Sequence, residues 1–426
     1  MDVKIYDQNP LEIISQLSCD QFQRPLRTIP NYIVIFENDK NLKDLLRFNE
    51  LSGSPENART GRIWNEEDDS LVRAYIEQVY GLRHKECYND AFNVICNKNR
   101  YNPIKRLIES KKWDGKKRID TLLQKYLNCE DNDYTREVAR LIFAGGIARL
   151  YDCGCKFDFM PIFKGSQGAG KSSFVRWLAL NDSWFKEVND IDGQEGREAL
   201  EGAWICEISE LLALTKSKEV EAVKSFITRQ NDNYRKPYER RVTDNPRKCI
   251  FIGTTNKSQF LTDKTGNRRF LPIEVRIQGH SLFEKEKECK EDILQCWLEA
   301  KHNFDSKNYS LVINQKVISL VKEQQEQCVE DDWRIGIIEK YIENKSNTCV
   351  KDIWDNAFKY SEKPITKKDS NDIVAIFDNC FNDTWEKVSC IRFDNYGRQR
   401  GWRKKKVDFE PIVDSSQTQE IDEIFG

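Results

Sequence analysis

The sequence predicts an α/β fold for the middle of the chain, flanked by two mainly helical regions. In the middle, short apolar runs alternate with helical stretches, which is the pattern of buried parallel strands joined by helices. One run, MPIF at 160–163, leads directly into the glycine-rich stretch KGSQGAGKSS at 164–173. We therefore expect a parallel sheet with a phosphate-binding loop at the end of one strand.

The expected strands and regions follow from these patterns. The α/β core is predicted over 111–305, and residues 1–110 form a helical N-terminal or collar region, with helical periodicity clearest over 68–82. Residues 310–407 return to helices and end in a hairpin, and the acidic tail 408–426 is expected to be flexible. The predicted strands of the core are MPIF (160–163), AWICEI (203–208), KCIFIGTT (248–255) and RFLPIEV (269–275).

Length and composition indicate a soluble protein with two or three domains. The chain has 426 residues, a hydrophobic fraction of 39%, a charged fraction of 32% and a net charge of −2. No apolar run approaches the roughly 20 residues of a membrane-spanning helix, and the first ten residues lack the apolar core of a signal peptide. We therefore expect a cytosolic protein. Its net charge is near zero, so local clusters of charge indicate more about its partners than the total does.

The 14 cysteines are scattered, and three of them, Cys96, Cys206 and Cys249, lie in apolar runs. In a reducing compartment they are expected to act as small core residues. Cys153 and Cys155 form the one tight pair, but no histidine or second cysteine pair lies near them. A zinc site is therefore not expected.

The glycine-rich stretch matches the pattern G-x-x-x-x-G-K-[ST] in full, and the amphipathic helix SSFVRWLAL follows it. Such a loop points its backbone N–H groups at phosphate oxygens, so the sequence predicts ATP and Mg²⁺ as cofactors. Lys171 is expected to bind the β and γ phosphates, and Ser172 to bind Mg²⁺. The predicted cofactor-binding residues are Gly165, Ser166, Gln167, Gly168, Ala169, Gly170, Lys171, Ser172 and Ser173.

Hydrolysis also needs carboxylates near the metal and the attacking water. AWICEISEL ends in Glu207 and Glu210, and we assign Glu207 to the Mg²⁺ shell and Glu210 to orienting water. The order of the two roles remains open, because the usual pattern has adjacent acids, whereas Ile208 follows Glu207 here. Two solvated glutamates at the start of a helix are the alternative. Asn256 follows the next predicted strand, where an amide can sense the γ phosphate, hold the water or simply cap a turn.

Two adjacent arginines follow a Gly-Asn turn in DKTGNRRFLPIEV. In an oligomeric ATPase such a residue can enter the neighbour's site and neutralise transition-state charge. We assign Arg268 to this role and Arg269 to a structural or second phosphate contact; the order of the two remains open, and a solvated turn is the alternative.

These motifs resemble the virulence-associated protein E family, whose members are replication ATPases of phages and pathogenicity islands related to superfamily 3 helicases. The resemblance covers roughly 100–275, and it implies an AAA+ core, a ring of six subunits and ATP-driven movement on DNA at a replication origin. The matching stretches are YNPIKRLIESKKWDGKKRIDTL, FKGSQGAGKSSFVRWLA, WICEISEL, VKSFITRQNDNYRKPYERR, FIGTTNKSQFL and TGNRRFLPIEV.

Two basic segments are the predicted DNA contacts. Residues 224–248 hold eight basic and three acidic residues together with two tyrosines, and the resemblance implies a DNA-gripping hairpin there. Residues 398–406 hold six basic residues of nine, and helices followed by such a hairpin are typical of a winged-helix-like domain. Solvated basic surfaces are the alternative for both. The predicted contacts are Lys224, Arg235, Lys236, Tyr238, Arg240, Arg241, Arg398, Arg400, Trp402 and Arg403.

The leading functional hypothesis is therefore an ATP-dependent replicative DNA helicase, with single-stranded DNA in the ring and duplex DNA on the C-terminal domain. The alternative is a nucleotide-switched initiator that binds and melts an origin without processive unwinding. A small-molecule kinase would share the phosphate loop but would need neither the arginine pair nor the basic segments.

Overall fold

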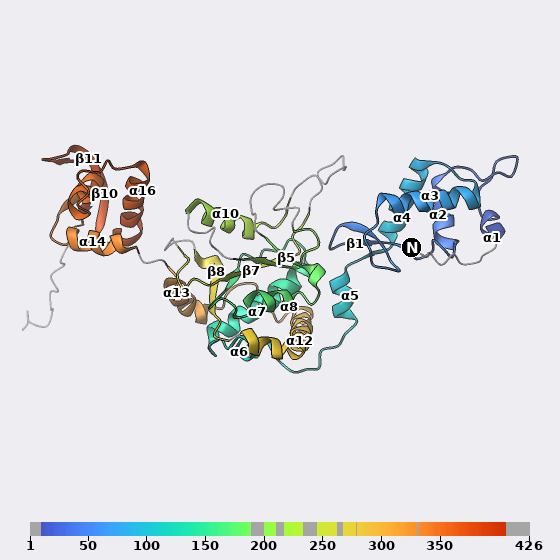
Figure 1. Cartoon of the computed structure of the whole chain (residues 1–426), viewed down its shortest axis with the longest axis horizontal. Coiled ribbons are helices and arrows are strands. Elements are labelled where there is room, and N and C mark those ends of the chain that lie inside the picture. The colour runs from blue at the N-terminus through green and yellow to red at the C-terminus, as the bar shows by residue number, and fades with distance from the viewer. Residues whose placement is uncertain are drawn as a thin grey trace, which may run out of the picture. The chain divides into compact units, whose positions relative to one another are not determined.

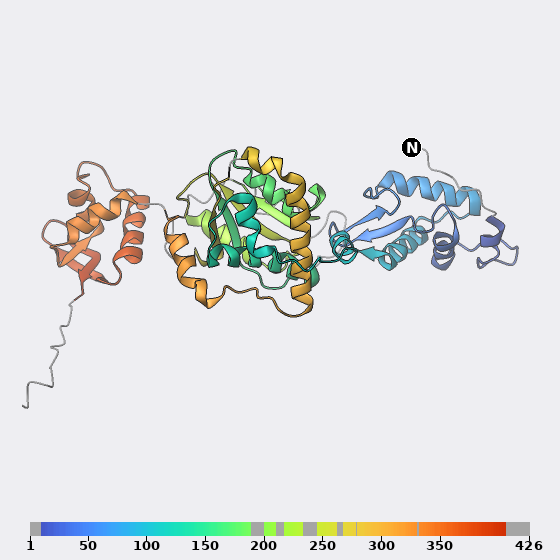
Figure 2. The same cartoon turned by 90° about the horizontal axis from the view of Figure 1, so that it is seen from below.

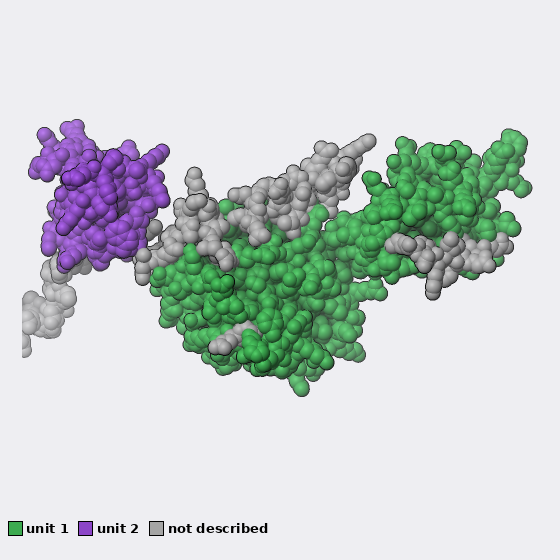
Figure 3. All heavy atoms as spheres, in the orientation of Figure 1, with its two compact units in different colours: residues 1–329 green, residues 330–426 purple. Residues whose placement is uncertain are grey.

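The computed structural model describes residues 10–188, 200–209, 217–232, 245–261, 267–277, 279–329 and 332–405. The chain divides into two compact units, residues 1–329 and residues 330–426 (Figure 3). The first unit holds the N-terminal helices and a large parallel sheet, and the second holds a small antiparallel sheet with helices.

A five-stranded sheet forms the centre of the first unit, in the order β5-β6-β7-β4-β8 (Figures 1 and 2). Every neighbouring pair is parallel, so all the carboxyl ends lie along one edge. The chain passes from β4 to the far edge, returns through β6 and β7, and then crosses β4 to reach β8. The strands are β4 (Met160–Lys164), β5 (Phe185–Glu187), β6 (Ile205–Ile208), β7 (Ile250–Thr255) and β8 (Phe270–Glu274).

This arrangement confirms the predicted mixed α/β fold with a parallel sheet. All four predicted apolar runs form strands. The edge strand β5 was not expected, because FKE is short and mostly polar and carries no apolar run.

Helices cover both faces of the sheet, with α10 on the opposite side from α7, α8 and α12 (Figure 1). Ile205 and Ile250 face the core that α7, α8 and α12 share, whereas Cys206 and Phe251 face the core that includes α10. Burial on both faces explains why these strands read as continuous apolar runs. The helices are α7 (Asp133–Tyr151), α8 (Lys171–Leu178), α10 (Ser217–Thr228) and α12 (Glu286–Asp305).

The core beneath the sheet is packed around two tryptophans. The ring centroids of Trp204 and Trp297 lie 4.2 Å apart, and both rings approach Gly146 of α7. A Cβ atom at Gly146 would lie 2.5 Å from the Trp297 ring, so this position accepts no larger residue. Each buried aromatic side chain of this kind contributes about 1.5–3 kcal/mol of hydrophobic stabilisation.

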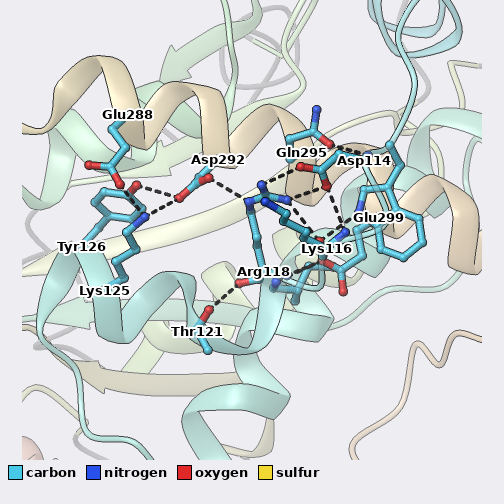
Figure 4. Close-up of polar contacts among 12 residues, drawn as sticks. Asp114, Lys116, Arg118, Thr121, Lys125, Tyr126, Glu288, Asp292, Gln295 and Glu299 are labelled. Atoms are coloured by element: carbon cyan, nitrogen blue, oxygen red, sulfur yellow. Dashed lines mark hydrogen bonds and ion pairs between the residues drawn. The ribbon is translucent and has the colours of Figure 1, made fainter.

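A polar network joins α6 (Ile119–Leu127) to α12 (Figure 4). The Arg118 guanidinium bridges Asp114 and Asp292 at 2.7 and 2.8 Å. The buried Glu299 carboxylate of α12 accepts the backbone N–H groups of Arg118 and Ile119, which caps the start of α6. The first N–H groups of a helix have no acceptor within the helix and need one when they are buried. The Glu299 carboxylate supplies it, and this contact fixes α6 against α12.

The remaining elements of the first unit include the predicted helix over 68–82, which is observed as α3. Asn65 and Asp68 form a capping box at its start, and Gly81 ends it with a φ of 69°. A small sheet in the order β2-β1-β3 was not expected in this region. The elements are α1 (Pro10–Ile14), α2 (Ile29–Asn38), β1 (Leu46–Asn49), β2 (Ser54–Asn57), α3 (Glu66–Tyr80), α4 (Lys85–Lys98), β3 (Arg100–Tyr101), α5 (Pro103–Glu109), η1 (Asp182–Trp184), η3 (Asn267–Arg269), α11 (Gly279–Glu284), η4 (Gln315–Val317) and α13 (Ile318–Glu326).

The second unit packs helices against a sheet in the order β10-β11-β9. The predicted hairpin is confirmed, because β10 and β11 pair antiparallel with a register shift between Val388 and Ile391. The elements are α14 (Trp333–Ile342), β9 (Asn347–Cys349), α15 (Val350–Asp352), η5 (Ile353–Ala357), α16 (Lys367–Ile376), η6 (Phe377–Phe381), β10 (Trp385–Phe393) and β11 (Gly397–Lys404).

Two further sequence expectations concern cysteines and membrane spans. Cys96, Cys206 and Cys249 are buried as predicted, and all 14 cysteines are free thiols. Among the described residues, no helix combines the length and apolar character needed to cross a bilayer.

Candidate nucleotide site and nucleic-acid surfaces

The glycine-rich loop lies between the end of β4 at Lys164 and the start of α8 at Lys171, as the motif predicts. A Cβ atom at Gly165 would lie 2.6 Å from the carbonyl oxygen of Val275, just past β8, so the loop can leave the sheet here only with glycine. Gly170 takes a φ of 77° at the N-cap of α8. The first N–H groups of this helix lack intrahelical acceptors and are the donors that suit a phosphate group.

Lys171 lies inside this loop, 9% exposed. Its Nζ donates to the carbonyl oxygens of Gly165 and Ser166 at 2.9 and 2.8 Å. Burial lowers the pKa of the ammonium, an effect that the charge of Glu207 partly opposes. The loop therefore holds a cation at its centre whose described hydrogen-bond partners are neutral carbonyls.

Glu207 connects three elements at the carboxyl edge of the sheet. Its Oε1 accepts the hydroxyl of Ser172 from α8 and the hydroxyl of Thr254 from β7, both at 2.6 Å. Glu207 is 2% exposed, and burial raises the pKa of its carboxyl, while the two hydroxyls favour the charged form and oppose that rise. Ser172 itself is exposed, so the pair lies at the boundary between core and solvent.

Thr254 was missed by sequence reasoning. The signal was available in the alternation of β7, because Ile250 and Ile252 face the α8 side of the sheet and Thr254 continues that face. What the sequence alone does not give is the register between β6 and β7, in which Glu207 pairs with Ile252.

The Ser172 hydroxyl and the Glu207 carboxylate fit the preference of Mg²⁺ for oxygen ligands. Among the described residues, no group of three or more histidine, cysteine, aspartate or glutamate side chains could hold a metal on its own. A site with one carboxylate suits an ion that takes its other ligands from phosphate and water. Glu210, predicted to orient water, lies outside the described residues.

Asn256 directly follows β7 and is exposed. β7 lies between β6 and β4, so the carboxyl ends that carry Glu207, Asn256 and the loop are neighbours along one edge. Ligands of parallel sheets bind at such an edge where the direction of strand progression reverses, as it does between β7 and β4.

The arginine pair lies at the other end of the sheet. Arg268 and Arg269 lie in η3, directly before β8, and Phe270 pairs with Met160 at the start of β4. The five residues of β4 separate this position from the loop by roughly 17 Å at 3.3 Å per residue. Arg268 is exposed and Arg269 is half-buried. The pair is therefore remote from the loop of its own chain.

The structure corrects one residue of the first predicted DNA segment. Lys224 of α10 is 3% exposed, so its side chain is not available to a DNA backbone. Arg235, Lys236, Tyr238, Arg240 and Arg241 lie outside the described residues.

The base of that segment is an antiparallel pairing of 230–232 with 245–247. Asp232 donates its N–H to Asn245 O at 2.9 Å, and Arg247 donates to Gln230 O at 2.8 Å. The Arg247 guanidinium and Asp232 carboxylate form a buried bidentate pair with both contacts at 2.7 Å. The guanidinium also lies over the Phe251 ring of β7, which ties this base to the sheet.

A second correction concerns the C-terminal hairpin. Trp402 is 3% exposed and stacks on Phe377 with ring centroids 4.0 Å apart, so it belongs to the core of the second unit and cannot stack on a base. Arg398, Arg400 and Arg403 are exposed as predicted. Arg392 of β10, which was not predicted, pairs directly opposite Arg398.

The comparisons decide the family. The virulence-associated protein E-like domain matches residues 108–330, more than half of the chain. The chain belongs to this family. The match includes the whole sheet, the glycine-rich loop, the arginine pair and α13, and it confirms the resemblance carried by the motifs.

Solved structures give weaker likenesses. The apo structure of the NrS-1 C-terminal region (305–718) is 16% identical, with a TM-score of 0.49, and covers 84% of this chain and 96% of that chain. The A form apo structure of the same region is 14% identical, with a TM-score of 0.45, and covers 85% and 96%. No curated protein matches the chain. The family assignment comes from the domain match.

Proposed function

We propose that this protein is an ATP-driven DNA helicase that serves the replication of a phage or mobile genetic island as a ring of six copies. In this proposal the α/β core of the first unit is an AAA+ ATPase, and the second unit is a winged-helix-like domain that binds duplex DNA. The observation that carries the proposal is the contact of Ser172 with Glu207 beside the loop that holds Lys171.

Each group at the loop has a role in ATP hydrolysis. The loop N–H groups and Lys171 bind the phosphates, and Lys171 exchanges its carbonyl partners for phosphate oxygens. Ser172 and Glu207 would hold Mg²⁺, which neutralises charge on the phosphates when bound. Glu207 performs this role in its ionised form, and Asn256 or Glu210 orients the attacking water.

The position of the arginine pair supports action in trans. Arg268 and Arg269 lie at the amino end of β8, whereas the loop lies at the carboxyl end of β4, so neither serves the site of its own chain. A neighbouring copy that presents Arg268 at the loop would complete the site, and such an arginine contributes about 10³–10⁵ in rate. This requirement makes hydrolysis depend on assembly.

DNA contacts are proposed at two places. The first is the segment 233–244, which lies outside the described residues. Its described flanks, Asp232 and Arg247, form a buried ion pair, and the Arg247 guanidinium lies over Phe251 of β7, the strand that precedes Asn256. A shift at the nucleotide site could reach the DNA through this connection. In the second unit, Arg398 and Arg400 are exposed on β11, and Arg392 pairs opposite Arg398. Like charges in direct opposition destabilise a strand pair, and an anion such as a phosphate relieves this repulsion.

The test is Glu207→Gln, which keeps the volume and removes the charge. We expect ATP hydrolysis to fall by about 100-fold or more, the scale of a lost electrostatic interaction in an active site, while nucleotide binding persists. The two readouts are ATP hydrolysis in the presence of DNA and binding of a fluorescent ATP analogue. Wild-type turnover by Glu207→Gln would contradict the proposed site.

A forked DNA substrate separates the helicase from the alternative, an initiator that melts an origin without processive unwinding. The helicase displaces one strand of the fork in an ATP-dependent reaction. The initiator hydrolyses ATP and binds the same DNA but leaves the fork paired.

A further inference from the structure

We propose that Gln325 is a positioning residue that holds the Arg268–Arg269 turn in the place from which it serves a neighbouring copy's nucleotide site. The inference rests on the proposed function, in which Arg268 acts in trans. It adds a residue that lies outside the sheet, on α13, and that no sequence motif indicates.

The Gln325 side chain contacts the backbone on both sides of the arginine pair. The Gln325 side-chain amide is buried, and its Nε2 donates to Asn267 O at 2.9 Å and to Phe270 O at 2.8 Å. These two carbonyls stand immediately before Arg268 and immediately after Arg269. Both N–H groups of one side chain therefore fix the backbone on either side of the pair.

The end of α13 also holds the approach to this turn. Cys328 O accepts the N–H groups of Phe260 and Leu261, both at 2.9 Å, and Leu261 forms a parallel bridge with Val329. Phe260 and Leu261 follow β7 and Asn256. Gln325 of α13, together with Cys328 and Val329 just beyond the helix, thus contacts the chain on both sides of residues 262–266.

Placement of the turn matters because the Arg268 side chain is exposed and, among the described residues, no contact with a carboxylate holds it in place. The backbone that carries Arg268 decides which phosphates its guanidinium can reach. An arginine that must meet a phosphate in trans loses rate steeply with small misplacement, at about 100-fold for 1 Å.

The test compares Gln325→Met with Gln324→Met in the full-length protein. Methionine preserves the length of the side chain but donates no hydrogen bond, and Gln324 lies one position earlier on the same helix with no such bond described. We expect Gln325→Met to lower the maximal ATP turnover about 100-fold with the KM for ATP within twofold. Gln324→Met is expected to match wild type.

A mixing experiment separates positioning from a general structural defect. Gln325→Met and Lys171→Ala are each expected to be slow alone, but a mixed ring contains sites in which the intact loop of the first meets the well-placed Arg268 of the second. Turnover is therefore expected to rise above the sum of the separate variants. Arg268→Ala mixed with Lys171→Ala is the reference, because it reports the trans arginine itself.

The outcomes are distinguishable. Recovery in both mixtures supports the proposal. Recovery with Arg268→Ala but not with Gln325→Met overturns the role of Gln325 and leaves the proposed function standing. Recovery in neither mixture overturns both the trans arginine and the role of Gln325. A Gln325→Met protein with wild-type turnover overturns the role of Gln325 alone. If Gln325→Met does not fold, Gln325→Leu, which also lacks a hydrogen-bond donor and buries no charge, replaces it in every arm.

Discussion

At the residue scale, the candidate site depends on one buried carboxylate. Glu207 stays in contact with Ser172 and Thr254 through short hydrogen bonds, and these donors offset part of the cost of burying its charge. Sequence reasoning placed Lys171, Ser172 and Glu207 at one site, because the first two belong to one motif and Glu207 lies near the end of a predicted strand. It did not predict Thr254, because that contact depends on strand register.

The two predictions of DNA contacts that the structure contradicts, Lys224 and Trp402, failed for the same reason. Both residues lie in basic segments, and the composition of those segments, together with the DNA-binding hairpins expected there, favoured them as DNA contacts. Composition does not tell which side of a helix or strand a residue occupies, and both side chains turn toward the cores of their units. A tryptophan within a basic hairpin is therefore as much a packing signal as a stacking signal.

Removing the Thr254 hydroxyl tests the electrostatics of this site. Thr254→Val takes one donor from the Glu207 carboxylate, so the pKa of Glu207 rises further. Activity that requires the carboxylate is present above that pKa and lost as the pH falls through it, so the acid limb of the ATP turnover profile should move to higher pH. Turnover at pH 7 should fall about tenfold, the scale of a hydrogen bond to a charged group.

The control is Thr255→Val, because the Thr255 hydroxyl accepts the Lys257 N–H and no hydrogen bond between it and Glu207 is described. Its pH profile should follow wild type. An acid limb that moves equally in both variants, or in neither, would contradict the role of Thr254.

At the element scale, the strand–loop–helix unit could be predicted because each part carries a local signal. β4 is an apolar run, the loop has its glycines and α8 is amphipathic. The edge strand β5 and the sheet of the N-terminal region could not, since their strands are short and partly polar. β5 pairs with β6 and β3 pairs with β1 across longer stretches of chain, whereas β1 and β2 form a local hairpin. Strand order likewise depends on contacts between residues far apart in sequence.

The loop itself gives a paired prediction. Gly165→Ala places a Cβ atom against the Val275 carbonyl, so the loop has to shift and nucleotide affinity should fall by at least tenfold. Gly168→Ala meets no atom within 4 Å and costs only its left-handed backbone, about 1–2 kcal/mol. Binding of a fluorescent ATP analogue measures both variants. A weaker effect at Gly165 than at Gly168 would argue against the described loop geometry.

The C-terminal hairpin gives a prediction about DNA. Replacing Arg398 and Arg400 together by alanine should weaken duplex binding and reduce the dependence of log affinity on log salt by about 2, one for each phosphate that the variant no longer neutralises. The readout is the affinity for duplex DNA measured across a salt series. The control is Lys363→Ala, which removes a positive charge from an exposed residue elsewhere in the same unit. An unchanged salt dependence in the double variant would contradict the assigned surface.

At the scale of the whole molecule, the two compact units are proposed to have different roles. The first carries the proposed nucleotide site, the arginine turn and α13, and the second begins directly after Val329, which forms a bridge with Leu261. The loop and the arginine pair occupy opposite ends of one sheet, and this separation leads to the central claim that a neighbouring copy completes each site.

The most direct test of that claim is to measure ATP turnover per subunit and particle mass in the same samples, over a dilution series with DNA and Mg²⁺. The account predicts that turnover per subunit rises as copies assemble and becomes negligible when the protein is a monomer. A monomer that hydrolyses ATP on DNA at the full rate of the assembled protein would contradict it.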